Sequence, residues 1–340
     1  MRVVRIALLG ICCALAALPG TSCAPKGGEE SGQIIARDSR GKGFNRKYTR
    51  VISLAPNMTE IFCRLSARYT NETPVGATET GTTSNNQESG GNAAQGGEDG
   101  GGSHDRGTGG GDKSIQPPTR ARLIAVSEQC DWPESIRSLP RAGSMLMPDY
   151  ERILRLAPDI VLASFEGNPP ALEAVLARAN IPLYVARVDS LAALYTTLTN
   201  LSLLFSLTEG QREGMAWERE LGENLNALRG ALRGQRIFFQ IGDTTQAWSF
   251  GKTTLLHDLI RLAGAENLGA RRAGSFPQFD SEALSRLDPD MVILLSGSDP
   301  KSDAAFWARY APRARLLRVP PDRFERPGPR MVEAMRGIMP

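Results

Sequence analysis

Two similar stretches of the chain decide the fold: residues 149–162, Asp-Tyr-Glu-Arg-Ile-Leu-Arg-Leu-Ala-Pro-Asp-Ile-Val-Leu, and residues 280–293, Asp-Ser-Glu-Ala-Leu-Ser-Arg-Leu-Asp-Pro-Asp-Met-Val-Ile. Matching positions lie 131 residues apart, so that Glu151 matches Glu282. Each copy predicts a helix with an aspartate N-cap, a Pro-Asp turn and a buried parallel strand. Two lobes built alike explain the repeat most simply. A chance match of one common helix-to-strand turn is the alternative.

Short apolar runs alternate with helical patterns along the rest of the chain, which favours the α/β class with parallel sheets. Strands are predicted at residues 50–55, 123–126, 160–163, 183–186, 237–240 and 292–295. After the first strand, Asn57 is expected as a helix N-cap with Glu60 three residues later, the spacing of a capping box.

The two lobes are expected on either side of a helical connector. No strand is predicted between residues 189 and 233, and leucines at helical spacing there predict a long amphipathic connector: Leu221, Leu225, Leu228 and Leu232. The N-terminal lobe then spans residues 47–188 and the C-terminal lobe residues 234–340. Residues 71–118 are rich in Gly and polar residues and are expected to form a disordered insertion in the first lobe.

The first 22 residues have the pattern of a secretory signal peptide. A basic start is followed by the apolar run 6–18 and then by small residues. The run is too short for a membrane span. Gly20-Thr-Ser-Cys23 resembles the cleavage box of bacterial lipoproteins, which predicts an exported, periplasmic or cell-surface protein anchored to the membrane by lipid on Cys23. Plain secretion with an unmodified Cys23 is the alternative. Residues 23–46 are expected as a flexible tether.

Two cysteines, Cys63 and Cys130, remain after the signal cysteines and Cys23 are set aside. In an oxidising compartment such a pair predicts one disulfide. Two free, buried thiols are the alternative, and metal binding by two cysteines alone is not expected.

Composition and motifs give no indication of catalysis. A net charge of +3 gives no reason to expect nucleic acid as a partner. The sequence lacks the serine-hydrolase elbow, the zinc-protease helix motif and the phosphate-binding glycine loop. The two histidines, His104 and His257, are too few for a histidine-based metal site. We therefore expect no enzyme activity, no catalytic residue, no resident cofactor and no metal site.

Aromatic residues are scarce, yet several lie in turn-rich segments that follow predicted strands: Trp132, Trp248, Phe276 and Phe324. Loops at the carboxyl ends of parallel strands form the ligand crevice of α/β folds. These side chains are therefore candidates for contact with a flat apolar ligand. The alternative is that each one closes the edge of its own hydrophobic core.

An ordered set of motifs resembles a known family. The motifs are Val51-Ile-Ser-Leu-Ala-Pro-Asn-Met-Thr-Glu-Ile61, Val126-Ser-Glu-Gln-Cys-Asp-Trp-Pro133, the Glu151 segment, Gly251-Lys, Gly264-Ala-Glu-Asn267, Phe276-Pro-Gln278 and Asp322-Arg-Phe-Glu-Arg-Pro-Gly-Pro-Arg330. Together they resemble the helical-backbone class of ABC-importer periplasmic binding proteins, and within it most closely the cobalamin (vitamin B12)-binding receptors. The resemblance covers about residues 48–340 apart from the insertion.

The resemblance implies two Rossmann-like lobes with central parallel sheets, joined by a long connecting helix, with little closure on the ligand. It also implies that Glu151 and Glu282 dock onto arginines of the permease dimer. These are the two glutamates that the internal repeat pairs. The alternative for each is that a glutamate in the first turn of a helix simply complements the helix dipole.

The resemblance further implies a set of ligand-binding residues: Trp132, Met145, Phe165, Trp248, Phe276, Asp322 and Arg326. Met145 and Ser164, the latter next to Phe165, stand where relatives carry tryptophan. Asp322 and Arg326 match polar residues that face the amide groups of the corrin, and an i,i+4 surface ion pair is their alternative. Some relatives also carry cysteines at positions matching Cys63 and Cys130, which favours the disulfide.

The expected function is that of a substrate-binding protein which captures cobalamin or a related corrinoid and delivers it to an ABC permease. Haem or a ferric siderophore in the same crevice is the first alternative, although no Tyr or His stands at a matched position. A metallocluster enzyme on a similar two-lobed fold is the second, and the small number of Cys and His residues argues against it.

Overall fold

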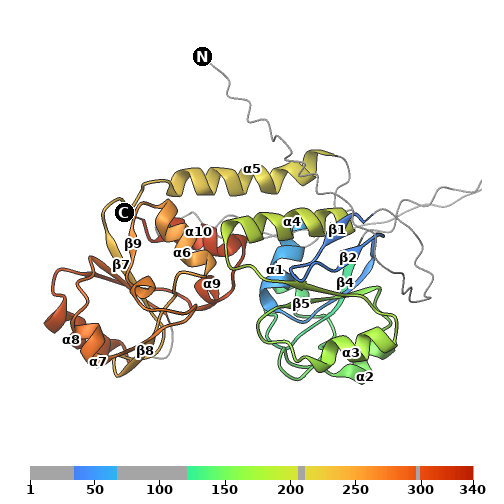
Figure 1. Cartoon of the computed structure of the whole chain (residues 1–340), viewed down its shortest axis with the longest axis horizontal. Coiled ribbons are helices and arrows are strands. Elements are labelled where there is room, and N and C mark those ends of the chain that lie inside the picture. Colours follow the sequence, from blue (N-terminus) through green and yellow to red (C-terminus); the bar gives the residue numbers. More distant parts are fainter. Residues whose placement is uncertain (1–33, 67–120, 206–210, 296–298, 340) are drawn as a thin grey trace, which may run out of the picture. The chain divides into compact units, whose positions relative to one another are not determined.

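A computed structural model describes residues 34–66, 121–205, 211–295 and 299–339 (Figure 1). The predicted signal peptide, Cys23 and the predicted insertion at residues 71–118 lie outside the described residues. The N-terminal lobe is coloured blue to green and the C-terminal lobe orange to red in Figure 1.

The N-terminal lobe is built on a parallel sheet of four strands. They are β3 (Arg50–Ser53), β4 (Arg122–Val126), β5 (Ile160–Ser164) and β6 (Leu183–Ala186), in the order β4-β3-β5-β6. Every residue of β5 and β6 is buried, as expected for parallel strands that are covered on both faces. All four strands were predicted from their apolar runs.

The C-terminal lobe contains a second parallel sheet of four strands. They are β7 (Arg236–Gln240), β9 (Glu266–Asn267), β11 (Met291–Leu294) and β12 (Arg315–Arg318), in the order β12-β11-β7-β9. Only β7 and β11 were predicted. A two-stranded antiparallel sheet, β8 (Gln246–Trp248) with β10 (Gln278–Asp280), was also not anticipated.

The internal repeat has the local structure that the sequence predicts. Helix α2 (Tyr150–Arg155) precedes β5, and helix α7 (Ser281–Ser285) precedes β11. The Asp149 carboxylate accepts a hydrogen bond from the Arg152 backbone N–H at 2.9 Å, and Asp280 accepts one from Ala283 N–H at 2.8 Å. Each aspartate is therefore the N-cap of its helix, and the α/β fold with two similar parallel sheets is confirmed.

The N-terminus of α1 differs from the prediction. The helix spans Pro56–Leu65, with Ala55 at the N-cap and proline at its first position. Proline is favoured there because its missing N–H is not needed and its φ is already helical. Asn57 is consequently inside the helix, and the Glu60 side chain is buried against arginines instead of closing a capping box.

The start of the fold also differs from the prediction. Residues 34–46, expected as the end of a solvated tether, contain an antiparallel pair, β1 (Ala36–Arg37) and β2 (Gly43–Phe44). Ala36 and Phe44 are buried in the core, with the Phe44 ring 5.4 Å from that of Tyr184. Apolar residues spaced within a Gly-rich and charged segment are a weak sequence signal, and burial against the lobe outweighs the composition.

The described residues of the connector form two helices, α4 (Leu191–Phe205) and α5 (Gln211–Leu228), in the region where a helical connector was predicted. Both contact α1 of the first lobe and α6 (Leu255–Leu262) of the second, and α5 also contacts α10 (Pro329–Gly337). The four leucines that predicted the connector are buried. One hydrophobic cluster therefore runs through both lobes and the connector, and each lobe has a further cluster of its own.

The other helices cover the faces and ends of the two sheets. They are α3 (Ala171–Arg178), α8 (Pro300–Tyr310) and α9 (Asp322–Glu325), with single 3-10 turns at Glu134–Ile136 and Leu268–Arg271. Among the described helices, none is both long and apolar enough to cross a membrane.

Candidate functional site

A cavity of about 430 Å³ lies between the two lobes. In the first lobe, segments that follow β3, β5 and β6 help to form it, and the carboxyl ends of parallel strands are the position at which α/β sheets bind ligands. The first lobe contributes the N-terminus of α1 and the loops after β5 and β6. The second contributes the segment 250–256, Ser275, Phe276 and the turn between α9 and α10.

The cavity wall is mainly apolar. Met145 of the first lobe lines it, as do Phe250, Phe276 and Phe324 of the second lobe. The Phe276 side chain is about half exposed, at 51%, and its ring meets that of Phe250 edge-on with 5.8 Å between centroids. Phe324 is fully buried behind the wall, so it supports the cavity, whereas Phe276 has a free face that a flat ligand could cover.

Three of the predicted ligand-binding residues line this cavity: Met145, Phe276 and Arg326. The other four lie around it. Phe165 is 49% exposed beside two lining residues, and the Arg187 guanidinium stacks 3.3 Å from the centroid of its ring. Trp248 is 44% exposed at the end of β8. Ligand contact by these residues stays a prediction.

Trp132 and Asp322 lie close to the cavity and contact the same arginine. The Arg330 guanidinium lies 4.6 Å from the centroid of the Trp132 ring and donates a 2.9 Å hydrogen bond to the Asp322 carboxylate. Trp132 is partly buried against the hydrophobic core. Both side chains therefore hold Arg330 in place.

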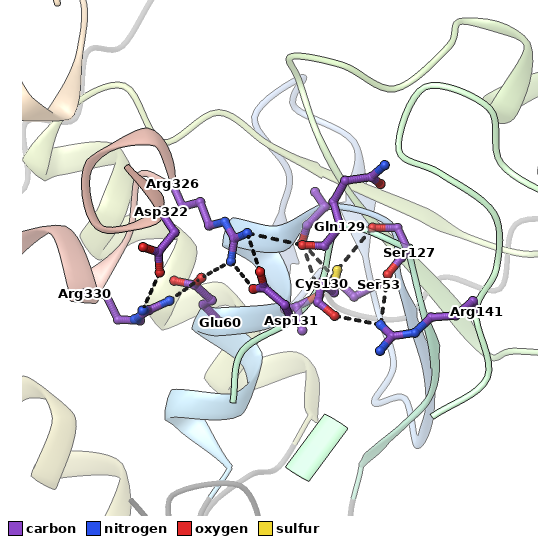
Figure 2. Close-up of polar contacts among 12 residues, drawn as sticks. Ser53, Glu60, Ser127, Gln129, Cys130, Asp131, Arg141, Asp322, Arg326 and Arg330 are labelled. Atoms are coloured by element: carbon purple, nitrogen blue, oxygen red, sulfur yellow. Dashed lines mark hydrogen bonds and ion pairs between the residues drawn. The ribbon is translucent and has the colours of Figure 1, made fainter. Parts of the chain in front are cut away.

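A network of charged side chains joins the two lobes (Figure 2). One of its members, Arg326, lines the cavity. Arg326 donates to the Glu60 carboxylate at 3.0 Å and, through both terminal nitrogens, to Asp131 at 2.5 and 3.1 Å. Arg330 donates to the same oxygen of Glu60 at 2.7 Å. The expected alternative for Asp322 and Arg326, a pair within one helix turn, is not what forms, because Arg326 binds carboxylates of the other lobe.

The carboxylates of this network have shifted pKa values. Burial raises the pKa of Glu60, although Arg330 and Arg326 act in the opposite direction. The hydrogen bond from Arg326 lowers the pKa of Asp131, which is more exposed. A buried pair of this kind is costly to break because removal of one partner leaves an uncompensated charge. The network therefore ties α1 to the α9–α10 segment of the other lobe.

The predicted disulfide between Cys63 and Cys130 is wrong: both residues are free, buried thiols. The Cys130 sulfur lies 3.1 Å from the hydroxyl oxygens of Thr59 and Ser127, so it has polar partners inside the core. Burial raises the pKa of both thiols. The cysteine count indicates how many pairs are available, but it does not show whether the two side chains face each other.

Glu151 and Glu282 occupy the same place in the two copies of the repeat. Each lies in the first turn of its short helix, α2 or α7, and each is exposed. Glu282 forms an i,i+4 ion pair with Arg286. The two carboxylates are thus available to a partner in equivalent settings, one per lobe, and permease docking stays a prediction.

Sequence reasoning missed the structural roles of Glu60, Asp131 and Arg330. Glu60 is a charged residue among the buried side chains of α1, which include Met58, Ile61 and Phe62. A carboxylate on an apolar helix face is a signal that it needs a buried cationic partner. The partner itself is not predictable locally, since Arg326 is 266 residues away. Among the described residues, no group of three or more His, Cys, Asp or Glu side chains is arranged to hold a metal ion.

Comparison with known proteins defines the class. Residues 118–307 match the periplasmic binding protein family. This match spans more than half of the chain, and the chain therefore belongs to that family.

Among the proteins to which the chain is similar, two are named as vitamin B12-binding proteins. The chain is 30% identical over 223 residues to a vitamin B12-binding protein of Pectobacterium atrosepticum, covering 64% of this chain and 79% of that protein. It is 26% identical over 223 residues to a vitamin B12-binding protein of Vibrio parahaemolyticus, covering 63% and 79%.

Solved structures share the fold. The periplasmic vitamin B12-binding protein of Vibrio cholerae has a TM-score of 0.57 at 20% identity, covering 85% of this chain and 94% of that one. The periplasmic haem-binding protein of Vibrio cholerae has a TM-score of 0.60 at 18% identity, covering 85% and 97%. The two-lobed fold is therefore shared by binding proteins whose named ligands differ.

Proposed function

We propose that this protein is the substrate-binding protein of an ABC importer, which captures cobalamin or a related corrinoid between its lobes and delivers it to the permease. The observation that carries the proposal is the mainly apolar cavity of about 430 Å³ between the lobes, which in the first lobe lies at the carboxyl ends of the parallel strands. The named ligand of the similar Pectobacterium and Vibrio proteins supports a corrinoid. The continuous core through the connector favours small closure on binding.

Direct binding tests the proposal. The mature protein should bind cyanocobalamin with 1:1 stoichiometry in titration calorimetry and retain its red colour through gel filtration. Absence of both heat and colour would refute the corrinoid assignment.

Two aromatic residues allow a matched test of the site. Phe276→Ala removes a ring that lines the cavity, and we expect about tenfold weaker binding from the lost apolar contact. Tyr310→Ala removes a ring of similar exposure on α8 that does not line the cavity, and affinity should change less than about threefold. The reverse order would place the ligand outside the cavity.

Haem or a ferric siderophore is the alternative ligand, because solved haem-binding proteins have the same fold. No His or Tyr is found among the described residues that line the cavity, so the common protein ligands of haem iron are not supplied there. Retention of an iron-containing chromophore in place of cobalamin during purification would favour this alternative.

Export with lipid anchoring at Cys23 completes the proposal. Relatives of the family are periplasmic binding proteins, which agrees with the signal-like start of the sequence. Cys23→Ala should move the protein from the membrane fraction to the soluble fraction without changing ligand affinity. An unchanged membrane fraction would show that Cys23 is not the anchor.

A further inference from the structure

Asn57 is an unexplained polar side chain at the cavity. It is the second residue of α1, it lines the cavity, and it is only 6% exposed. Its amide nitrogen Nδ2 has no hydrogen-bond partner among the described residues. Buried side-chain amides nearly always have a partner, so this exception requires a cause.

The N-terminus of α1 lies at the same place. The helix is ten residues long, and both Pro56 and Asn57 in its first turn line the cavity. Ala55 at the N-cap has no side-chain oxygen to accept from the first-turn N–H groups, and the N-terminus of a helix carries partial positive charge. The first-turn N–H groups of α1 and the Nδ2 of Asn57 are therefore hydrogen-bond donors on the same side of the cavity.

We infer that Asn57 is a specificity-determining residue, whose amide N–H donates to a neutral acceptor oxygen of the carboxamide class on the ligand; this inference rests on the proposed function. Three carboxylates line the cavity, those of Glu166, Asp189 and Glu325, against the single guanidinium of Arg326. That guanidinium is already shared by Glu60 and Asp131.

The surrounding charge decides between acceptor groups. A ligand carboxylate or phosphate at Asn57 would share the cavity with three carboxylates, and the one lining guanidinium is already engaged. An amide carbonyl accepts the same hydrogen bond without charge repulsion. The site thus selects a ligand whose edge carries amides and disfavours one whose edge carries acids.

Asn57→Leu is the direct test, because leucine has the same branched side-chain skeleton but no donor. Affinity for cyanocobalamin should fall about 10- to 100-fold, since a ligand oxygen loses its partner. The Tm of the ligand-free protein should stay the same or rise, because the buried amide had no partner to lose. Equal affinity of wild type and Asn57→Leu would overturn the inference.

Two further variants separate hydrogen bonding from shape. Asn57→Asp keeps the shape and suits the helix N-terminus, but it offers a carboxylate to the ligand oxygen, so it should weaken binding at least as much. Asn226→Leu is the matched control, because Asn226 is an exposed residue of α5 that does not line the cavity, and affinity should change less than about threefold. Full affinity of Asn57→Asp would contradict donation by Asn57.

The ligand side is tested with the cyanocobalamin monocarboxylic acids, in which one peripheral propionamide is hydrolysed to a carboxylate. Wild type should bind at least one of these isomers about tenfold or more weakly than cyanocobalamin, and Asn57→Leu should lose most of that preference. If all isomers bind wild type as tightly as cyanocobalamin does, the inference fails. If wild type binds no cyanocobalamin, the proposed function itself has failed, which is a different result from equal binding by wild type and Asn57→Leu.

Discussion

The two lobes attach the Pro-Asp turn to the central strand of the sheet in the same way, but the other hydrogen-bond donors to the turn aspartate differ. In both, the aspartate of the Pro-Asp turn hydrogen-bonds to the start of the central strand: Asp159 accepts from Arg50 N–H at 2.9 Å, and Asp290 accepts from Arg236 N–H at 2.8 Å. Asp159 also accepts hydrogen bonds from the backbone N–H and the hydroxyl of Thr49, at 3.0 and 2.7 Å. Asp290 instead accepts two further hydrogen bonds from the Arg236 guanidinium, at 3.0 and 2.9 Å.

One residue of the repeat explains the difference. Position 157 is alanine, and the matching position 288 is aspartate. Asp288 forms an ion pair with Arg236 and holds its guanidinium beside Asp290. In the first lobe the Arg50 guanidinium instead donates to the backbone oxygens of Leu156 and Ala157. The position of the turn aspartate is thus retained while its partners have diverged, which identifies the turn as the common feature of the lobes.

The strongest predicted effect concerns Glu151 and Glu282, which lie in the first turn of the helix that precedes each Pro-Asp turn. Glu151→Ala with Glu282→Ala should reduce uptake of the ligand by cells at least about 100-fold, because the change removes both exposed carboxylates that are predicted to pair with arginines of the permease. Affinity for the ligand should not change, since neither residue lines the cavity.

The single variants compare how much each lobe contributes to docking. If both lobes dock equally, Glu151→Ala and Glu282→Ala should each reduce uptake by a similar factor. Glu223→Ala, an exposed glutamate of α5, is the matched control and should transport normally. Uptake at the wild-type rate by the double variant would remove the docking assignment.

The second prediction concerns the stability of the turns. Asp159→Ala should lower the free energy of unfolding by about 2–3 kcal/mol, because it leaves partly buried donors of Thr49 and Arg50 without their charged acceptor. Asp290→Ala should cost only about 1 kcal/mol, because its ion pair with Arg236 is exposed to solvent. Urea unfolding of both variants measures this, and an equal or reversed order would contradict the unequal burial of the two aspartates.

The same aspartates predict a pH dependence. Burial raises the pKa of Asp159, but hydrogen bonds from Thr49 and Arg50 lower it more, and the hydrogen bond from Arg236 lowers the pKa of Asp290. A depressed pKa in the folded state means that the stabilisation is complete above the unfolded value, about pH 4, and is lost as pH falls through the folded value. The stability difference between wild type and Asp159→Asn should therefore be constant from pH 5 to 7 and shrink below about pH 4. A difference that persists at pH 2 would show that it does not come from the ionised carboxylate.

The sequence predicts what depends on local pattern and misses what depends on distant partners. The buried strands β5 and β6 are continuous apolar runs and were found, whereas β12, with arginine at both ends and only one neighbouring strand, was not. Glu60 matched a capping box in spacing, but the packing of α1 directs it to Arg326 and Arg330 of the other lobe.

The cavity, too, contains residues that the sequence predicted and residues that it did not. Met145, Phe276 and Arg326 were reached through resemblance to a family, and they line the cavity. Asn57 was missed because its sequence context fits a helix N-cap equally well. The free state of Cys63 and Cys130 depends on side-chain geometry inside the core, which no residue count contains.

Arg286→Ala should have only a small effect, and it tests whether Glu282 can exchange Arg286 for an arginine of the permease. Its ion pair with Arg286 is exposed on both sides, and such i,i+4 pairs contribute about 0.5 kcal/mol or less. Arg286→Ala should therefore leave the urea midpoint nearly unchanged, and a permease arginine can replace Arg286 at little cost. A loss of more than about 1 kcal/mol would mean that Arg286 holds Glu282 within the lobe. The two docking glutamates would then differ in availability, and uptake should depend more on Glu151 than on Glu282.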